Sequence, residues 1–191
     1  MAYWDMNSVN VYNSKKPINK PEDVKGLKIR TPPEIQLQAC MEALGAVVTK
    51  IAFPEVYMAL AQNVVDGEEN PIAVIYHNKF YEVQKYLALT RHVYNNMIHV
   101  VSTKAWAKLT PEQQKIFREE SKSAGAYMRN AIVAEETDQV AKIEKAGVMV
   151  TRPNLAPFRA AMGPAYERIG KYSGEDNVKK FMPYVEAARK R

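Results

Sequence analysis

Arg30 is the residue of this chain whose type and position point most directly to chemistry. It is the only arginine among the first ninety residues, in a stretch that is rich in lysine. A guanidinium group can hold a carboxylate by two parallel hydrogen bonds, which an ammonium group cannot do. Arg30 also ends a predicted strand, just before Pro32-Pro33, and open α/β sheets bind ligands at the carboxyl ends of their strands. By composition alone, an ordinary surface arginine is an equally good interpretation of Arg30.

An acidic segment, Asp66-Gly67-Glu68-Glu69-Asn70-Pro71, is the second candidate. Two neighbouring carboxylates could act as a catalytic pair or belong to a cation site. The alternating ligands of a calcium loop, which end in a distant glutamate, are absent. The simpler interpretation is a short buried strand at Val64-Val65 followed by a turn, in which Asp66 accepts backbone hydrogen bonds. Spacing alone favours this turn.

The remaining reactive groups carry less weight. His77, His92 and His99 lack the spacing of metal ligands, so we predict polar surface residues or hydrogen-bonded ones. Cys40 lies on the apolar face of a predicted helix, where a buried and inert thiol is expected. The sequence contains no glycine-rich phosphate loop and no GxSxG, HExxH or CxxC motif. We therefore predict no catalytic residue, no metal and no cofactor.

The elements that would position these residues alternate between strand and helix in the first half of the chain. Strands alternate apolar and polar residues, whereas helices repeat apolar residues every three to four positions. This pattern predicts strands at Tyr3–Tyr12, Leu27–Thr31 and Ala46–Ile51, with helices at Glu34–Leu44 and Pro54–Gln62. Two further strands are predicted at Tyr86–Thr90 and Met97–Ser102. Such an order is typical of a mixed α/β fold with a parallel element.

The second half is predicted to be mostly helical. Thr110-Pro111-Glu112-Gln113 forms a capping box with proline at the first helical position. From there to Lys145 only Gly125 disfavours a helix, which would be about 50 Å long. A short strand at 148–150 follows, then a helix from Asn154 to Tyr172 and a last helix that begins near Ser173.

Composition places the chain among globular proteins without naming a partner. It has 191 residues, of which 47% are hydrophobic and 25% charged, and a formal net charge of +6. The basic residues are scattered in short clusters and are not interleaved with aromatic residues, so a nucleic-acid partner is not expected. No apolar stretch is long enough for a membrane span, and the first residues do not look like a signal peptide.

Three ordered blocks resemble one family. They are Gly26-Leu27-Lys28-Ile29-Arg30-Thr31-Pro32, Ala52-Phe53-Pro54-Glu55-Val56-Tyr57-Met58-Ala59-Leu60 and Val65-Asp66-Gly67-Glu68-Glu69-Asn70-Pro71. Together they resemble the solute-binding proteins of tripartite ATP-independent periplasmic (TRAP) transporters, of the dicarboxylate-binding type. The resemblance runs from about Trp4 to the last helix.

The resemblance implies a function and a set of ligand-binding residues. Arg30 would bind the carboxylate of a small organic acid, Phe53 would line the pocket, and Asn70 would contact the ligand, with Glu69 as a weaker candidate. The acidic segment would then be a binding loop. The family implies a periplasmic protein that captures its ligand without catalysis and works with the membrane subunits of a TRAP transporter.

The chain also departs from the family pattern. The family usually has serine where this chain has Pro54, and glutamine where it has Glu68. The Glu68 side chain could shift ligand specificity or simply face solvent. The resemblance implies an α/β, periplasmic-binding-protein-like lobe with a mixed sheet and a long helix that would span two lobes. The first lobe would be largely missing, so a truncated or shortened chain with an incomplete cleft and weak ligand binding, or none, is expected.

The predicted organisation follows from that lobe arrangement. Residues 1–95 would form the ligand-binding core of the second lobe, 96–135 would return to the first lobe, and 136–191 would complete the second. Apolar surface near Met97–Val101 and Ile116–Tyr127 would be exposed, and a homodimer would relieve it. Two other functions stay open: a folded regulatory or structural remnant without ligand, and a lyase or hydrolase that uses Glu68 and Glu69.

Overall fold

A mixed six-stranded sheet forms the centre of the computed structural model, which describes residues 2–189. The strand order is β3-β2-β4-β1-β5-β6. Strand β2 runs parallel to β3 and β4, and β5 runs parallel to β6, while β1 is antiparallel to β4 and β5. The strands are β1 (Ala2–Asn13), β2 (Lys28–Thr31), β3 (Val47–Lys50), β4 (Gly67–Pro71), β5 (Tyr86–His99) and β6 (Met149–Thr151).

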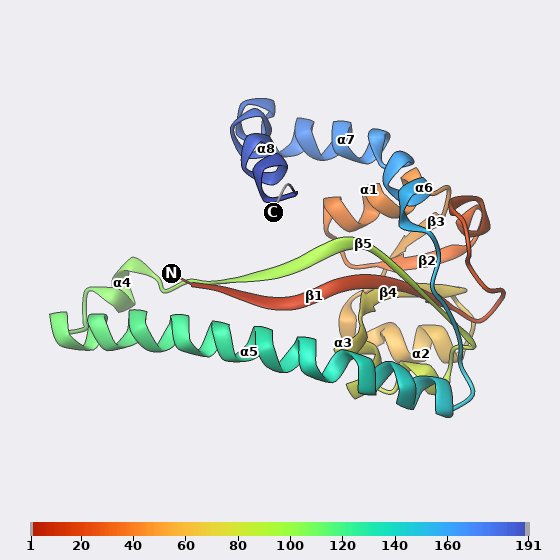
Figure 1. Ribbon diagram of the computed structural model, residues 1–191, viewed down its shortest axis with the longest axis horizontal. Helices are drawn as coiled ribbons and strands as arrows, with labels where there is room; N and C mark the ends of the chain where they lie inside the picture. Colours follow the sequence, from red (N-terminus) through yellow and green to blue (C-terminus); the bar gives the residue numbers. More distant parts are fainter. Residues whose placement is uncertain (1, 190–191) are drawn as a thin grey trace.

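Helices cover both faces of this sheet, as Figure 1 shows. The α-helices are α1 (Ile35–Ala43), α2 (Val56–Ala61), α3 (Ile72–His77), α4 (Thr103–Trp106), α5 (Pro111–Lys145), α6 (Leu155–Ala160), α7 (Gly163–Ser173) and α8 (Glu175–Arg189). Three short 3-10 helices are η1 (Pro21–Val24), η2 (Phe53–Glu55) and η3 (Phe80–Glu82).

Two hydrophobic clusters lie on opposite faces of the sheet. Successive strand residues point to opposite faces, so Val11 belongs to the cluster that includes α1, α6 and α7, and Tyr12 to the cluster of α2, α3 and the end of α5. Ile29 lies in the first cluster, so its neighbour Arg30 must point to the second face. The alternation along β2 therefore decides where the guanidinium goes.

Strands β1 and β5 extend beyond the rest of the sheet as a two-stranded ribbon beside α5 (Figure 1). A side chain at Gly125 would place its Cβ 2.8 Å from the carbonyl oxygen of Tyr3, so only glycine allows this close approach of helix and strand. The indole of Trp4 donates to the carbonyl oxygen of Ser121 over 3.1 Å and ties the ribbon to the helix. The one residue that disfavours the predicted long helix is thus a packing requirement.

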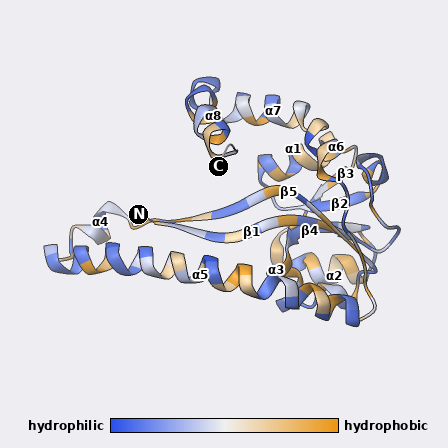
Figure 2. Ribbon diagram, viewed as in Figure 1, coloured by the Kyte–Doolittle hydropathy of each residue, from blue (hydrophilic) through white to orange (hydrophobic). Residues whose placement is uncertain are grey.

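Apolar side chains along this ribbon and the first half of α5 are exposed, as the sequence predicted. They include Ile98, Val100, Ile116, Phe117 and Tyr127, of which Tyr127 is 77% exposed. Figure 2 shows apolar residues interspersed with polar ones along α5. A helix that stayed fully exposed to solvent would not need so many apolar side chains on its surface.

Most predicted elements are confirmed. The strand at Tyr3–Tyr12 is β1, the α/β class with parallel pairing is present, and α5 begins at the Thr110 capping box and ends at Lys145. Gly45 has a positive φ of 83°, which suits its place after α1. The helix predicted at Pro54–Gln62 begins as the 3-10 turn η2 and continues as α2.

Three predictions about elements were wrong. The strand expected at Val64-Val65 begins only at Gly67, so Glu68 and Glu69 lie in the central strand β4 and not in a turn or loop. Asp66 lies just before that strand and accepts a hydrogen bond from the backbone N–H of Lys28, as predicted. The two strands predicted at 86–90 and 97–102 are one strand, β5, because it pairs with β1 along its length and accommodates two irregularities, between Asp5 and Asn7 and between Val9 and Val11. The helix predicted from Asn154 to Tyr172 is divided into α6 and α7 just before Gly163.

Candidate functional site

Arg30 is buried at the end of β2, with only 2% of its surface exposed. Its Nε donates to the carbonyl oxygen of Ile51 over 2.8 Å, and its Nη1 donates to Oε2 of Glu68 over 3.0 Å. Among residues 2–189, its Nη2 has no hydrogen-bond partner. Burial lowers the pKa of Arg30, while Glu69 and Glu34 act in the opposite direction. The guanidinium is therefore fixed at two nitrogens and retains donors for a ligand.

All four residues that the sequence proposed for ligand binding line one cavity of about 350 Å³. Arg30 reaches it from β2, Phe53 from η2, and Glu69 and Asn70 from the end of β4. Because β2 and β4 are parallel, their carboxyl ends meet at one edge of the sheet, where α/β folds place ligands. The other lining residues are Met6, Val9, Pro32, Glu34, Leu37, Val74, Asn78 and Asn95.

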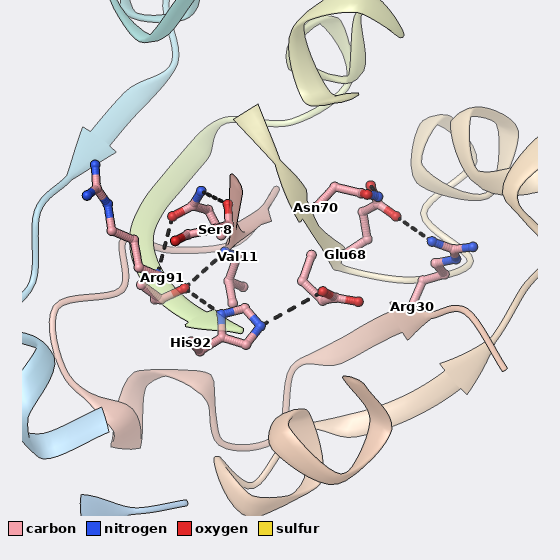
Figure 3. Close-up of polar contacts among 10 residues, drawn as sticks. Ser8, Val11, Arg30, Glu68, Asn70, Arg91 and His92 are labelled. Atoms are coloured by element: carbon pink, nitrogen blue, oxygen red, sulfur yellow. Dashed lines mark hydrogen bonds and ion pairs between the residues drawn. The ribbon is translucent and has the colours of Figure 1, made fainter. Parts of the chain in front are cut away.

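Glu68, on β4, is fully buried next to Arg30 of the neighbouring strand β2 (Figure 3). Its Oε2 accepts from Arg30, and its Oε1 accepts from Nδ2 of Asn70 over 2.7 Å and from the Tyr12 hydroxyl. Burial raises the pKa of Glu68 well above its usual range, and the hydrogen bond from Asn70 opposes that shift. The expectation that Glu68 could face solvent was wrong, because the in-register pairing of β2 and β4 places it against Arg30.

Glu69 points to the other face of β4, toward the buried His92 on β5. Its Oε2 lies 3.9 Å from Nε2 of His92, and within the described residues neither atom has a hydrogen-bond partner. Burial, and then the neighbouring Glu68, raise the pKa of Glu69 well above its usual range. Burial lowers the pKa of His92 to about 3. Both shifts favour the uncharged forms of this pair.

The buried His92 predicts a pH-dependent loss of stability. An unfolded histidine takes up a proton near pH 6.5, but the folded one does so only near pH 3, so the unfolded state binds more protons between these values. The free energy of unfolding should then fall by about 2 kcal/mol between pH 8 and pH 5 through this residue alone. Glu68 and Glu69 act in the opposite direction, because their raised pKa values favour the folded state as pH falls toward 4.5.

Comparison with His92→Gln isolates the histidine contribution. Urea unfolding of both proteins at several pH values should show the wild type losing stability relative to the variant as pH falls. A difference between the two proteins that does not change from pH 8 to pH 5 would contradict the assignment.

The other singled-out residues take structural places. Burial raises the pKa of the Cys40 thiol to about 11, which is consistent with the inert thiol that the sequence predicted. His99 shares a hydrogen bond with Ser121 over 2.7 Å and does not line the cavity. Within residues 2–189, no group of three or more His, Cys, Asp or Glu side chains could hold a metal ion. None of the described helices is both long enough and apolar enough to span a membrane.

Sequence reasoning missed the polar residues that complete the site. Tyr12 reaches Glu68 from the neighbouring strand β1, and Asn78, just after α3, and Asn95 of β5 line the cavity. Neither asparagine stands in a motif, and both come from elements far from Arg30 in the chain. Tyr12 gave one usable signal, because a tyrosine within an apolar strand needs a buried partner for its hydroxyl group.

Sequence comparison connects this arrangement to known proteins. Residues 1–172 match the profile of DctP, the bacterial extracellular solute-binding protein, family 7. The chain is 37% identical to the sialic acid-binding periplasmic protein SiaP of Vibrio cholerae, over 91% of the chain and 54% of that protein. It is 34% identical to the 2,3-diketo-L-gulonate-binding periplasmic protein YiaO of Escherichia coli, over 85% of the chain and 50% of that protein.

Solved structures share the fold at similar identity. A TRAP periplasmic solute-binding protein from Polaromonas sp. JS666, bound to D-erythronate, superposes with a TM-score of 0.87 at 34% identity. The match covers 94% of this chain and 59% of that protein. The chain thus spans about half the length of the curated relatives that it matches.

Proposed function

The chain belongs to bacterial extracellular solute-binding protein family 7, and from this premise we propose that it captures a small organic carboxylate through Arg30. The observation that carries the proposal is a buried arginine on a cavity wall with donors left for a ligand. A charge-assisted pair with a carboxylate contributes on the order of 1.5–3 kcal/mol. Phe53 supplies an apolar wall, and Asn70 and Glu69 supply polar contacts.

The proposed mechanism is capture of a ligand between two lobes. In the intact protein the ligand would favour a closed state by its contacts with both lobes, and the closed protein would meet the membrane subunits of a TRAP transporter. Residues 1–95 and 136–191 would belong to one lobe, and 96–135 would reach the other. The exposed apolar side chains on β5 and α5 support this division.

Arg30→Lys is the test of this function. We expect carboxylate affinity to fall about tenfold or more, because lysine keeps the charge but cannot make the paired hydrogen bonds. NMR titration with organic acids measures weak affinities directly. Arg91→Lys is the matched control, because Arg91 is half exposed in a pair with Glu136 outside this cavity. Equal affinities in the wild type and Arg30→Lys would contradict the proposal.

The proposal includes the absence of catalysis. A lyase or hydrolase would need Glu68 and Glu69 to act on one substrate. Adjacent residues of a strand point to opposite faces, and these two carboxyl groups have different partners, Arg30 and His92. This separation speaks against a catalytic pair.

The location and the partners complete the proposal. By its family the protein would work in the periplasm beside the membrane subunits of the transporter. The homodimer stays part of the proposal as well. It rests on the exposed apolar residues of β5 and α5, and light scattering would decide it by the presence or absence of a species with twice the mass of one chain.

A further inference from the structure

Glu68 uses both of its carboxylate oxygens to hold the polar wall of the cavity. Nη1 of Arg30 and Nδ2 of Asn70 face different oxygens of this one group, over 3.0 Å and 2.7 Å (Figure 3). Both nitrogens can only donate. Although burial favours its neutral form, the carboxyl group therefore has the surroundings of an ionised acceptor.

This arrangement determines how the Asn70 amide is turned. Because an ionised carboxylate only accepts hydrogen bonds, Asn70 must direct its nitrogen toward Glu68 and its carbonyl oxygen away from it. Asn70 and Arg30 both line the cavity, and they are neighbours because one carboxylate binds both. The wall thus combines the donors of Arg30 with an adjacent acceptor from Asn70.

We propose that Glu68 is a specificity-determining residue, which orients Asn70 so that the site prefers carboxylates with a hydroxyl group on the neighbouring carbon. The ligand carboxylate pairs with Arg30, and its 2-hydroxyl group donates to Oδ1 of Asn70. An acid without that hydroxyl cannot make this hydrogen bond with Asn70 and therefore binds less tightly. This inference rests on the proposed function and narrows its ligand to 2-hydroxy acids.

The role of Glu68 can be tested because glutamine has nearly the same shape. A glutamine offers one acceptor and one donor group. If its oxygen keeps accepting from Arg30, its nitrogen faces Asn70, which must then turn its carbonyl oxygen inward and present its own nitrogen to the cavity. Glu68→Gln should therefore remove the preference for the hydroxyl group.

NMR titration of the ¹⁵N-labelled chain with 2-hydroxybutyrate, as separate enantiomers, and with butyrate measures this preference. We expect the better enantiomer to bind about tenfold more tightly than butyrate in the wild type, and the ratio to fall below about threefold in Glu68→Gln and in Asn70→Ala. Arg91→Lys is the control, because Arg91 pairs with Glu136 outside this cavity and contacts neither Glu68 nor Asn70. Its ratio should match the wild type.

The outcomes separate this inference from the function beneath it. Binding of neither acid to the wild type would overturn both. Equal binding of the two acids to the wild type, or an unchanged ratio in folded Glu68→Gln and Asn70→Ala proteins, would overturn the role of Glu68 alone. Circular dichroism establishes whether each variant is folded. If one of the two variants does not fold, the other is sufficient for the test.

Discussion

Arg30→Ala is expected to lower the free energy of unfolding by about 3–5 kcal/mol at pH 8, because it leaves the Glu68 carboxylate buried without its cation. The two side chains are almost completely buried, so water cannot replace the lost partner. Glu68 can relieve the cost by taking up a proton, so the loss should be smaller at pH 5 than at pH 8. Urea unfolding at both pH values measures these differences.

A double-mutant cycle with Glu68→Gln shows whether the cost comes from this pair. If it does, Arg30→Ala combined with Glu68→Gln should lose clearly less stability than the two single changes added together. Arg91→Ala provides the matched control, since its pair with Glu136 is half exposed and should contribute less than about 1 kcal/mol. Additive losses in the cycle would show that the buried ion pair is not the cause.

Gly67→Ala is expected to destabilise the fold by about 3 kcal/mol, because strand β4 has no room for a Cβ at its start. A Cβ atom there would lie 2.2 Å from the carbonyl oxygen of Tyr12 and 2.7 Å from Cβ of Asn13. The first of these is a backbone atom of the central strand β1, so relief requires the strands to separate. Since β4 carries Glu68, Glu69 and Asn70, the change should also disturb the candidate site.

Gly163→Ala is the control for this substitution. A Cβ at Gly163 would meet no atom within 4 Å, and the residue begins helix α7 without a positive φ. Its stability should be unchanged or raised by up to about 1 kcal/mol, since alanine reduces the freedom of the unfolded chain. Thermal unfolding of the two variants compares them directly, and equal stabilities would refute the steric explanation.

Local patterns were sufficient for much of the fold. The capping box at Thr110 and the helical period after it predicted α5 over its full length, and Arg30 was correctly placed at the end of a strand. These features depend on residues within a few positions of one another. The sequence blocks also brought together Arg30, Phe53, Glu69 and Asn70, which do line one cavity. Their role in binding stays a prediction.

Local patterns failed where the partner lay far away in the chain. The acidic segment has the composition of a turn, yet it forms the central strand β4 between β2 and β1. Its carboxyl groups are buried there because Arg30 and Tyr12 reach Glu68 from the neighbouring strands. No local propensity contains that information, since the hydrogen bonds that permit burial join residues 38 and 56 positions apart.

The sequence by itself determined that this chain is an α/β protein with one arginine suited to a carboxylate, because side-chain type and periodicity are local properties. Only the tertiary structure decided that Glu68 accepts hydrogen bonds from both that arginine and Asn70. The reason is physical: a buried charge needs a partner within hydrogen-bond distance, and strand pairing alone determines which residue supplies it.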